Sequence, residues 1–240
     1  MEIPVWMSRT ALLLEKEEIE KLMSSNVLVV GLGGVGGICA EMIARAGVGK
    51  MTIVDADKVE ASNANRQIVA LKSTEGKLKS EVLAERLRDI NPTIELTVLS
   101  EFVDEKRVEE ILLSNRFDCA VDCIDTLTSK AGFIRKCVEN NVPIVSSMGA
   151  AGKLDPTKVS TADISKTFNC TLAHSVRKRL HVHGIKEGIQ TVFSTEKPDK
   201  SKMTLTEDGP KKSILGTISY MPAIFGCTAA SLVLKELIKK

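Results

Sequence analysis

Aromatic residues are scarce in this chain of 240 residues, at 3% of the composition. An RNA-binding sheet that stacks bases on exposed rings needs several of them, so the composition argues against that class of protein. Neither sign of charge dominates, because 33 lysines and arginines face 31 acids. A net charge of +2 does not suggest a nucleic-acid coat protein, and we expect no DNA partner. A hydrophobic share of 43% excludes a disordered chain.

Cysteine pairs spaced Cys-x-x-Cys are also missing, so neither a zinc ribbon nor a thioredoxin-like motif is encoded. The beginning of the chain, with Glu2 and Pro4, does not resemble a secretory leader. We therefore expect a cytoplasmic protein in which most thiols pack as small core residues. The six cysteines are Cys39, Cys119, Cys123, Cys137, Cys170 and Cys227.

Charge is absent from one stretch, 213–234, whose 22 residues are about the length of a bilayer span. Glycine, proline, serine and threonine interrupt it, so its mean hydropathy is modest. We therefore favour a buried strand followed by a C-terminal helix, from about Pro222 to Ile238, over a membrane-spanning helix.

Short apolar runs alternate with helical patterns through the first two-thirds of the chain. The clearest helical pattern covers 79–90 and is stopped by Asn91-Pro92. Strand, helix and strand in regular succession predict an α/β fold with a doubly wound, mostly parallel, Rossmann-like sheet and helices on both faces. We expect a single domain over 1–240. The runs expected as strands are 27–30, 51–54, 94–99, 119–121 and 142–145.

The pattern changes after about residue 150, where a strand is expected at 159–162 and a polar stretch follows at 166–212. That stretch has ten basic and five acidic residues, so its net charge is +5 while the rest of the chain carries −3. It could be a solvated, partly mobile insertion, or a contact surface for a polyanion. The three histidines all lie in it, without metal-like spacing to acids or thiols, and we predict no zinc.

A glycine-rich turn follows the first expected strand and opens a helix. Asp55 ends the next expected strand, 19 residues after the last glycine of the turn. Glycines let the backbone approach phosphates at a helix N-terminus, and the acid can accept hydrogen bonds from a ribose. The arrangement predicts a nucleotide site, although an NAD-dependent dehydrogenase would look the same up to Asp55. The glycines are Gly31, Gly33, Gly34 and Gly36.

The segment after Asp55 points to one kind of nucleotide chemistry. Residues 55–67 read Asp-Ala-Asp-Lys-Val-Glu-Ala-Ser-Asn-Ala-Asn-Arg-Gln, which resembles the signature of the adenylating family related to ubiquitin-activating enzymes. Lys79 and Asp125 match the remaining active-site positions of that family, and Thr126 stands where it usually has asparagine. The family includes the enzymes that activate sulfur-carrier proteins for molybdopterin and thiamine synthesis.

The resemblance implies ATP and Mg²⁺ as cofactors and a role for each matching residue. Asp125 would hold the magnesium ion, and Lys79 and Asn63 would lie near the phosphates. Arg66 would act on the phosphates of the partner subunit, which implies a homodimer. These types suit adenylation for a general reason, because cations neutralise the charge that builds on leaving pyrophosphate. The implied ATP-binding set is Gly31, Gly33, Gly34, Gly36, Asp55, Asp57, Asn63, Arg66, Gln67 and Lys79, and the implied catalytic set is Arg66, Lys79 and Asp125.

Further segments resemble one branch of the family, which dehydrates threonylcarbamoyladenosine beside the tRNA anticodon. The branch implies an ATP-dependent, tRNA-modifying enzyme that activates the threonyl carboxylate as an acyl-adenylate, after which the neighbouring carbamoyl group closes a ring. The basic stretch would then contact tRNA. The chain departs from the branch at Asn169-Cys170, where an aspartate-proline pair is usual. The matching segments include Arg9-Thr10, 149–157, 162–167, 176–180, 192–196 and 216–219.

Two other functions stay open at this point. The first is an adenylyltransferase for a ubiquitin-like sulfur carrier, against which the missing Cys-x-x-Cys pairs argue. Whichever function holds, a sulfur-relay protein could be a partner. The second is an idle nucleotide-sensing or sulfur-trafficking adaptor, which the presence of Arg66, Lys79 and Asp125 disfavours. Cys170 could form a thioester as in carrier-charging relatives, but we expect an incidental thiol. Cys227 is expected to pack.

Overall fold

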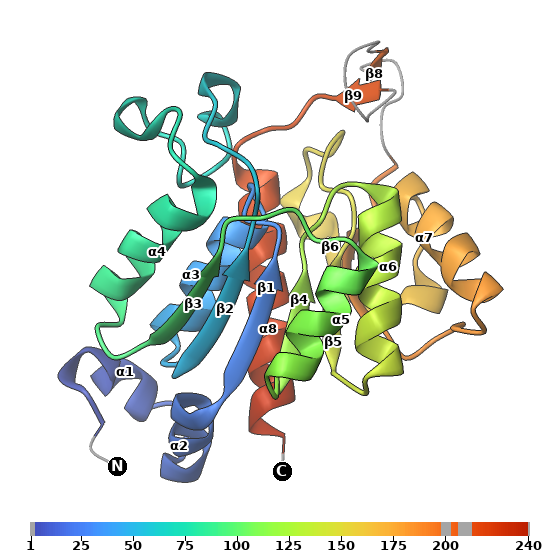
Figure 1. Cartoon of the computed structure of the whole chain (residues 1–240). Helices are drawn as coiled ribbons and strands as arrows, with labels where there is room; N and C mark the ends of the chain where they lie inside the picture. The colour runs from blue at the N-terminus through green and yellow to red at the C-terminus, as the bar shows by residue number, and fades with distance from the viewer. Residues whose placement is uncertain (1–2, 198–202, 206–212, 240) are drawn as a thin grey trace.

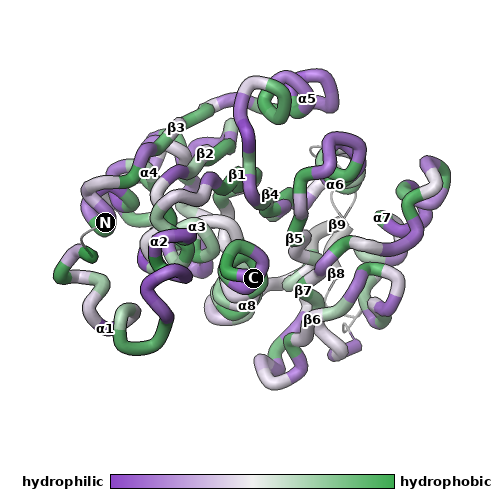
Figure 2. The backbone as a smooth tube through the Cα atoms, turned by 90° about the horizontal axis from the view of Figure 1, so that it is seen from below, coloured by the Kyte–Doolittle hydropathy of each residue, from purple (hydrophilic) through white to green (hydrophobic). Residues whose placement is uncertain are grey.

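One mixed sheet of seven strands organises the described part of the chain, in the order β3-β2-β1-β4-β5-β7-β6. Figure 1 shows the sheet with its helices, and Figure 2 also labels β7. A computed structural model describes residues 3–197, 203–205 and 213–239. All strands of this sheet run parallel except β6, which pairs antiparallel with β7. Because β2 and β3 lie on one side of β1 and β4 on the other, the winding direction reverses between β1 and β4. The predicted doubly wound fold is confirmed. The strands are β1 (Asn26–Val30), β2 (Lys50–Val54), β3 (Glu95–Leu99), β4 (Cys119–Asp122), β5 (Ile144–Ser147), β6 (Val159–Asp163) and β7 (Gln190–Ser194), with a separate antiparallel pair of β8 (Met203–Leu205) and β9 (Ser213–Leu215).

Helices cover both faces of the sheet, and each face has its own apolar core. Along β1, Val27 and Val29 belong to one core, which α3, α4 and α8 complete. Leu28 and Val30 belong to the other, which α5, α6 and α7 complete. This alternation follows from the period of two in a strand. The helices are α1 (Ser8–Ala11), α2 (Lys16–Ser24), α3 (Gly36–Arg45), α4 (Lys79–Ile90), α5 (Glu105–Ser114), α6 (Leu127–Glu139), α7 (Thr171–Val182) and α8 (Tyr220–Ile238), with short 3₁₀ helices at Val5–Met7, Ala61–Asn63, Lys72–Thr74, Pro156–Lys158 and Ile164–Lys166.

Helix α8 alone among the described helices is long and apolar enough to cross a membrane. In the fold it lies beside α3 and against the sheet, as the view from below shows (Figure 2). Met221, Phe225 and Val233 are fully buried in the core. A methyl group added at Gly226 would come within 2.5 Å of the Val35 carbonyl oxygen, so α8 packs very closely on the start of α3. The helix therefore has the packing of a core helix, as the sequence predicted. The prediction that Cys227 packs is wrong, because this residue lies on the exposed side of the helix.

The basic stretch at 166–212 contributes to the sheet itself. It contains α7 and the strand β7, which pairs with both β5 and β6. Its mobility stays a prediction. Four of its ten basic residues lie outside the described residues, namely Lys200, Lys202, Lys211 and Lys212.

Candidate active site

The loops after β1 and β4 meet at the carboxyl edge of the sheet, where the winding direction reverses. Gly31 has a φ of +87°, and a methyl group there would lie 2.8 Å from the Cys123 carbonyl oxygen. A methyl group on Gly36 would lie 1.7 Å from the Gly31 carbonyl oxygen. Only glycine fits at either position, because backbone occupies the space of a side chain. The predicted glycine turn and the segment that carries Asp125 are therefore in direct contact.

Asp55 ties the glycine turn to the end of β2. Its Oδ2 accepts a hydrogen bond from the Leu32 amide at 2.6 Å, and its Oδ1 accepts one from the Asp57 amide at 2.8 Å. Burial raises the pKa of Asp55, while these two amides and the nearby Lys79 ammonium oppose the rise. The carboxylate thus shapes the loop, a structural role that the sequence did not reveal, and each oxygen retains a lone pair for a ligand.

Lys79 is the first residue of α4 and lies close to Asp55 and Asp57, the two acids that follow β2. Only 6% of the residue is exposed, and its Nζ lies 2.8 Å from Oδ2 of the well-exposed Asp57. The backbone also joins these segments, since the Lys79 amide donates to the Asp57 carbonyl at 2.9 Å. Asp55, Asp57 and Lys79, which the sequence assigned to one site, form a cluster.

The loop between β2 and α4 folds against the glycine turn. The Arg66 carbonyl oxygen lies 3.1 Å from the place where Gly34 would carry a methyl group, and the corresponding place on Gly33 is 3.8 Å from the Gln67 amide nitrogen. The Arg66 guanidinium turns back to its own loop, where it donates to the Ser62 carbonyl at 3.0 Å and to Asn65 Oδ1 at 2.8 Å. The Arg66 backbone therefore lies at the glycine turn, whereas its guanidinium group is bound by Ser62 and Asn65 of its own loop.

Gln67 and Asn63 are both buried in this loop. Asn63 Oδ1 accepts from the Glu60 amide at 3.3 Å. Gln67 is 8% exposed, and its Oε1 has no hydrogen-bond partner among the described residues. An unsatisfied buried acceptor is costly, so such atoms concentrate where a ligand or water completes the network. Its place beside Gly33 fits a site whose polar contacts a nucleotide would complete.

Beneath the turn that carries Asp125 lies an ion pair that the sequence did not reveal. Asp122 ends β4, Lys130 lies on α6, and both side chains are 0% exposed, with Lys130 Nζ 2.7 Å from Asp122 Oδ2. Ser146 on β5 donates its hydroxyl to the same carboxylate. Burial raises the pKa of Asp122, and the Lys130 ammonium and the Ser146 hydroxyl oppose that rise. Asp125 itself is exposed at the edge of the sheet.

Further along the carboxyl edge, the segment after β5 meets the start of α7. Cys170 caps α7 and accepts from the Ala173 amide at 3.4 Å. Its sulfur lies 3.9 Å from the place where Gly149 would carry a methyl group. Lys153 is buried and donates to the carbonyls of Asn169 and Glu196, and burial lowers its pKa. Two of the segments that matched one branch of the family, 149–157 and 192–196, thus meet here, beside the Asn169-Cys170 pair at which the chain departs from it.

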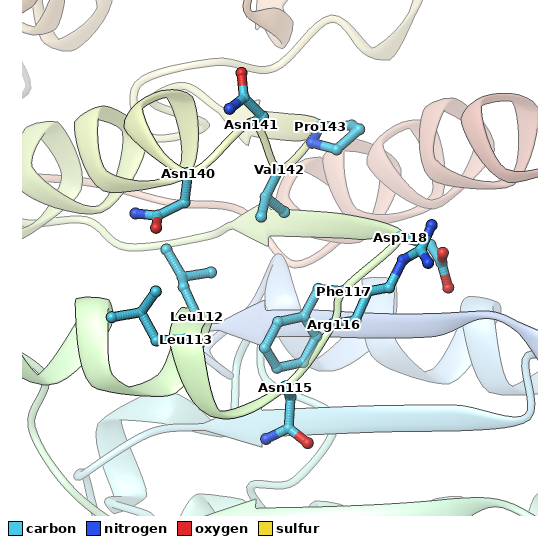
Figure 3. A pocket seen from close by; sticks show the side chains of 10 residues that line it. All are labelled: Leu112, Leu113, Asn115, Arg116, Phe117, Asp118, Asn140, Asn141, Val142 and Pro143. Atoms are coloured by element: carbon cyan, nitrogen blue, oxygen red, sulfur yellow. The ribbon is translucent and has the colours of Figure 1, made fainter.

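A hollow lies at the opposite edge of the sheet. It measures about 570 Å³ and is bounded by the segments that lead into β4 and β5 (Figure 3). Phe117 and Val142 give it an apolar floor, and Asn115 and Asn140 line its rim. Because it opens at the amino ends of the strands, it is separate from the glycine turn. Among the described residues, no group of three acids, histidines or cysteines forms a metal site.

The ThiF family model matches residues 7–240. The chain belongs to the ThiF family. Within that family it is 37% identical to the tRNA threonylcarbamoyladenosine dehydratase of Bacillus subtilis over 97% of this chain and 94% of that protein. A solved structure of the E. coli tRNA N6-threonylcarbamoyladenosine dehydratase in complex with ATP has a TM-score of 0.89 and 35% identity, and the match covers 99% of this chain and 97% of that chain.

The chain is also similar to adenylyltransferases. The molybdopterin-synthase adenylyltransferase of Haemophilus influenzae is 34% identical over 62% of this chain and 63% of its own length. Similarity to the dehydratases thus spans nearly the whole chain, including the segments after β5, whereas similarity to this adenylyltransferase spans less than two-thirds of it. The resemblance drawn from the motifs is confirmed for the family and for its dehydratase branch.

Proposed function

We propose that this protein is an ATP-dependent tRNA threonylcarbamoyladenosine dehydratase. The observation that carries the proposal is the match to such enzymes over nearly the whole chain, one of them solved with ATP. The fold agrees with it, because the glycine turn and the loop after β4 meet where the winding direction of the sheet reverses, between β1 and β4. In doubly wound sheets, this is the place where ligands bind.

The described residues supply what nucleotide binding at this place requires. The close-packed glycines leave backbone amides at the N-terminus of α3 for phosphate oxygens. Asp55 and Asp57 lie at the end of β2, where an acid can accept from ribose hydroxyls. Lys79 would exchange the Asp57 carboxylate for phosphate oxygens, and Asn63 and Gln67 would supply polar contacts beside Gly33.

The chemistry begins when the threonyl carboxylate attacks the α-phosphorus of ATP, which forms an acyl-adenylate and releases pyrophosphate. The carbamoyl group of the same nucleoside then attacks the activated carbonyl, the ring closes and AMP leaves, so that one water is lost overall. Because this attack is intramolecular, proximity supplies much of the rate and no protein nucleophile is required. Cations near the phosphates stabilise the developing charge.

Asp125 is the residue that we propose for Mg²⁺. Its position at the carboxyl end of β4 suits an ion held by one carboxylate together with phosphate oxygens, which is the usual arrangement for magnesium. When bound, the ion would neutralise charge on the leaving pyrophosphate. We also propose a homodimer in which Arg66 swings away from Ser62 and Asn65 to reach the partner's nucleotide.

The basic surface for tRNA centres on α7 in the described part of the chain. Lys178, Arg179 and Lys186 are exposed there, while Arg177 is occupied by the Ile164 and Thr167 carbonyls. Exposed cations suit contacts to a phosphate backbone. Lys178 and Arg179 lie on α7, and Lys186 lies in the loop that leads into β7, at the amino side of the sheet. A cytoplasmic location and a sulfur-relay protein partner complete the proposal, on resemblance alone.

The decisive experiment is one incubation of the purified protein with ATP, Mg²⁺ and tRNA that bears threonylcarbamoyladenosine. We expect AMP and a nucleoside lighter by one water, measured by mass spectrometry of the digested tRNA, and no reaction with unmodified tRNA. If tRNA is inert and the C-terminal glycine of a sulfur-carrier protein is adenylated instead, the adenylyltransferase alternative is correct.

Replacing Cys170 with alanine should leave AMP formation within about threefold of the parent, because intramolecular ring closure needs no thioester. A small loss of stability is expected, since the sulfur accepts the Ala173 amide at the start of α7. Cys170→Ser, which keeps a capping acceptor, is the matched control for that loss. A drop of about a thousandfold in both variants would show covalent catalysis by this thiol.

A further inference from the structure

We propose that the buried Asp122–Lys130 pair is a positioning device that fixes the peptide plane in front of Asp125. The inference rests on the proposed function, because it assigns Asp125 to the magnesium ion. Neither member of the pair reaches the surface, so neither can touch a nucleotide directly. Their effect must pass through the turn above them.

The hydrogen bonds around Ile124 show how that would occur. The Ile124 amide donates to Asp122 Oδ1 at 3.0 Å, and the Ile124 carbonyl accepts from Lys130 Nζ at 2.9 Å. The Ile124 carbonyl and the Asp125 amide belong to one planar peptide unit. Lys130 therefore fixes the orientation of the peptide unit that leads into Asp125, and with it the direction of the Asp125 side chain. Asp122 holds Lys130 in place, since its Oδ2 lies 2.7 Å from Lys130 Nζ.

The same turn supports the glycine loop from the other side. The Cys123 carbonyl oxygen lies 2.8 Å from the place where Gly31 would carry a methyl group. A shift of the 122–125 turn would therefore press on Gly31 or open a gap beside it. The pair thus holds the two phosphate-facing segments at a constant separation.

Stability alone does not explain why charges occupy this place. Taking an ion pair out of water costs about as much as the pair returns, and apolar side chains of similar volume often stabilise as well or better. Lys130 is also the fourth residue of α6 and reaches back past its N-terminus, where a positive charge works against the helix dipole. A role of the pair in positioning the 122–125 turn accounts both for the buried charges and for the lysine in the first turn of α6.

The test is the double variant Asp122→Asn/Lys130→Met, which removes both charges and retains most of the volume. We expect its melting temperature to stay within about 5 °C of the parent, as for other buried pairs replaced together. ATP binding without Mg²⁺, measured by calorimetry, should change by no more than about twofold, while the gain in ATP affinity on adding Mg²⁺ should shrink by at least about tenfold. AMP formation should fall by a similar factor.

The matched control is Glu41→Gln/Arg86→Met, which removes another buried acid and one of its two arginine partners, between α3 and α4, the other partner being Arg45. This pair lies away from the Asp125 turn, so the Mg²⁺ effect on ATP binding should equal that of the parent even where stability falls. A folded Asp122→Asn/Lys130→Met protein with the parent's Mg²⁺ effect overturns the proposal, and so does a parent whose ATP affinity ignores Mg²⁺. If the parent shows the Mg²⁺ effect but does not act on the modified tRNA, the proposed function fails and the positioning role is judged on calorimetry alone.

Discussion

Lys79→Met should reduce AMP formation by about a thousandfold, because a cation on the phosphates acts mainly in the transition state. The buried Lys79 ammonium is paired with Asp57, whose side chain is 71% exposed. Removing the ammonium leaves that carboxylate in water, and methionine fills the space of the stem. The protein should therefore stay folded. Single-turnover AMP release with modified tRNA measures the first effect, and thermal unfolding measures the second.

Lys77→Met is the matched control, since Lys77 is exposed two residues earlier on the same segment. We expect this variant to release AMP at the parent's rate. If Lys79→Met is as active as Lys77→Met, then the β2–α4 cluster is not the phosphate site and the proposed assignment of Lys79 is wrong. A loss confined to ATP affinity would place Lys79 in ground-state binding instead.

Most of the fold could be predicted from the sequence because its strands are short apolar runs bounded by polar residues. The helix expected at 79–90 has those bounds in the structure, since proline cannot continue it and its N-terminus follows the turn at 75–76 and the bridge at Leu78. Strand β7 was not expected as a strand, because Gln190, Thr191 and Ser194 make it read as polar. Thr191 and Ser194 are nonetheless buried, since β7 pairs on both sides.

Side-chain types and spacing in the sequence single out the glycines, Asp55, Lys79 and Asp125 as candidates, and their roles in nucleotide and metal binding stay predictions. The candidate site was not predictable where the backbone takes part. The Leu32 amide that binds Asp55 carries no signal in a sequence, because every residue has one. Lys130 escaped notice for a related reason, since a lysine in a helix normally indicates a solvated face, and only the three-dimensional position of Asp122 reveals its burial.

Gly36→Ala should destabilise the protein by about 3 kcal/mol or more, because overpacking against rigid backbone cannot be relieved by a rotamer change. The new methyl group would lie 1.7 Å from the Gly31 carbonyl oxygen. Gly31 cannot yield, since it is itself packed on the Cys123 carbonyl. Helix α3 cannot withdraw either, because α8 packs against its first turn at Gly226. Denaturant unfolding measures the loss, and calorimetry should show ATP binding lost with it.

Gly33→Ala separates this steric effect from a general intolerance of the glycine turn. Its methyl group would meet only the Gln67 amide nitrogen, at an ordinary 3.8 Å, so we expect a free energy of unfolding within about 1 kcal/mol of the parent. Equal stability of the Gly36→Ala and Gly33→Ala variants would mean that the glycine turn can open to accept a methyl group. The fold would then not require the close contact between this turn and the loop after β4. A stable Gly33→Ala protein with weakened ATP binding would instead indicate that Gly33 faces the nucleotide, as the fit of the turn to phosphates requires.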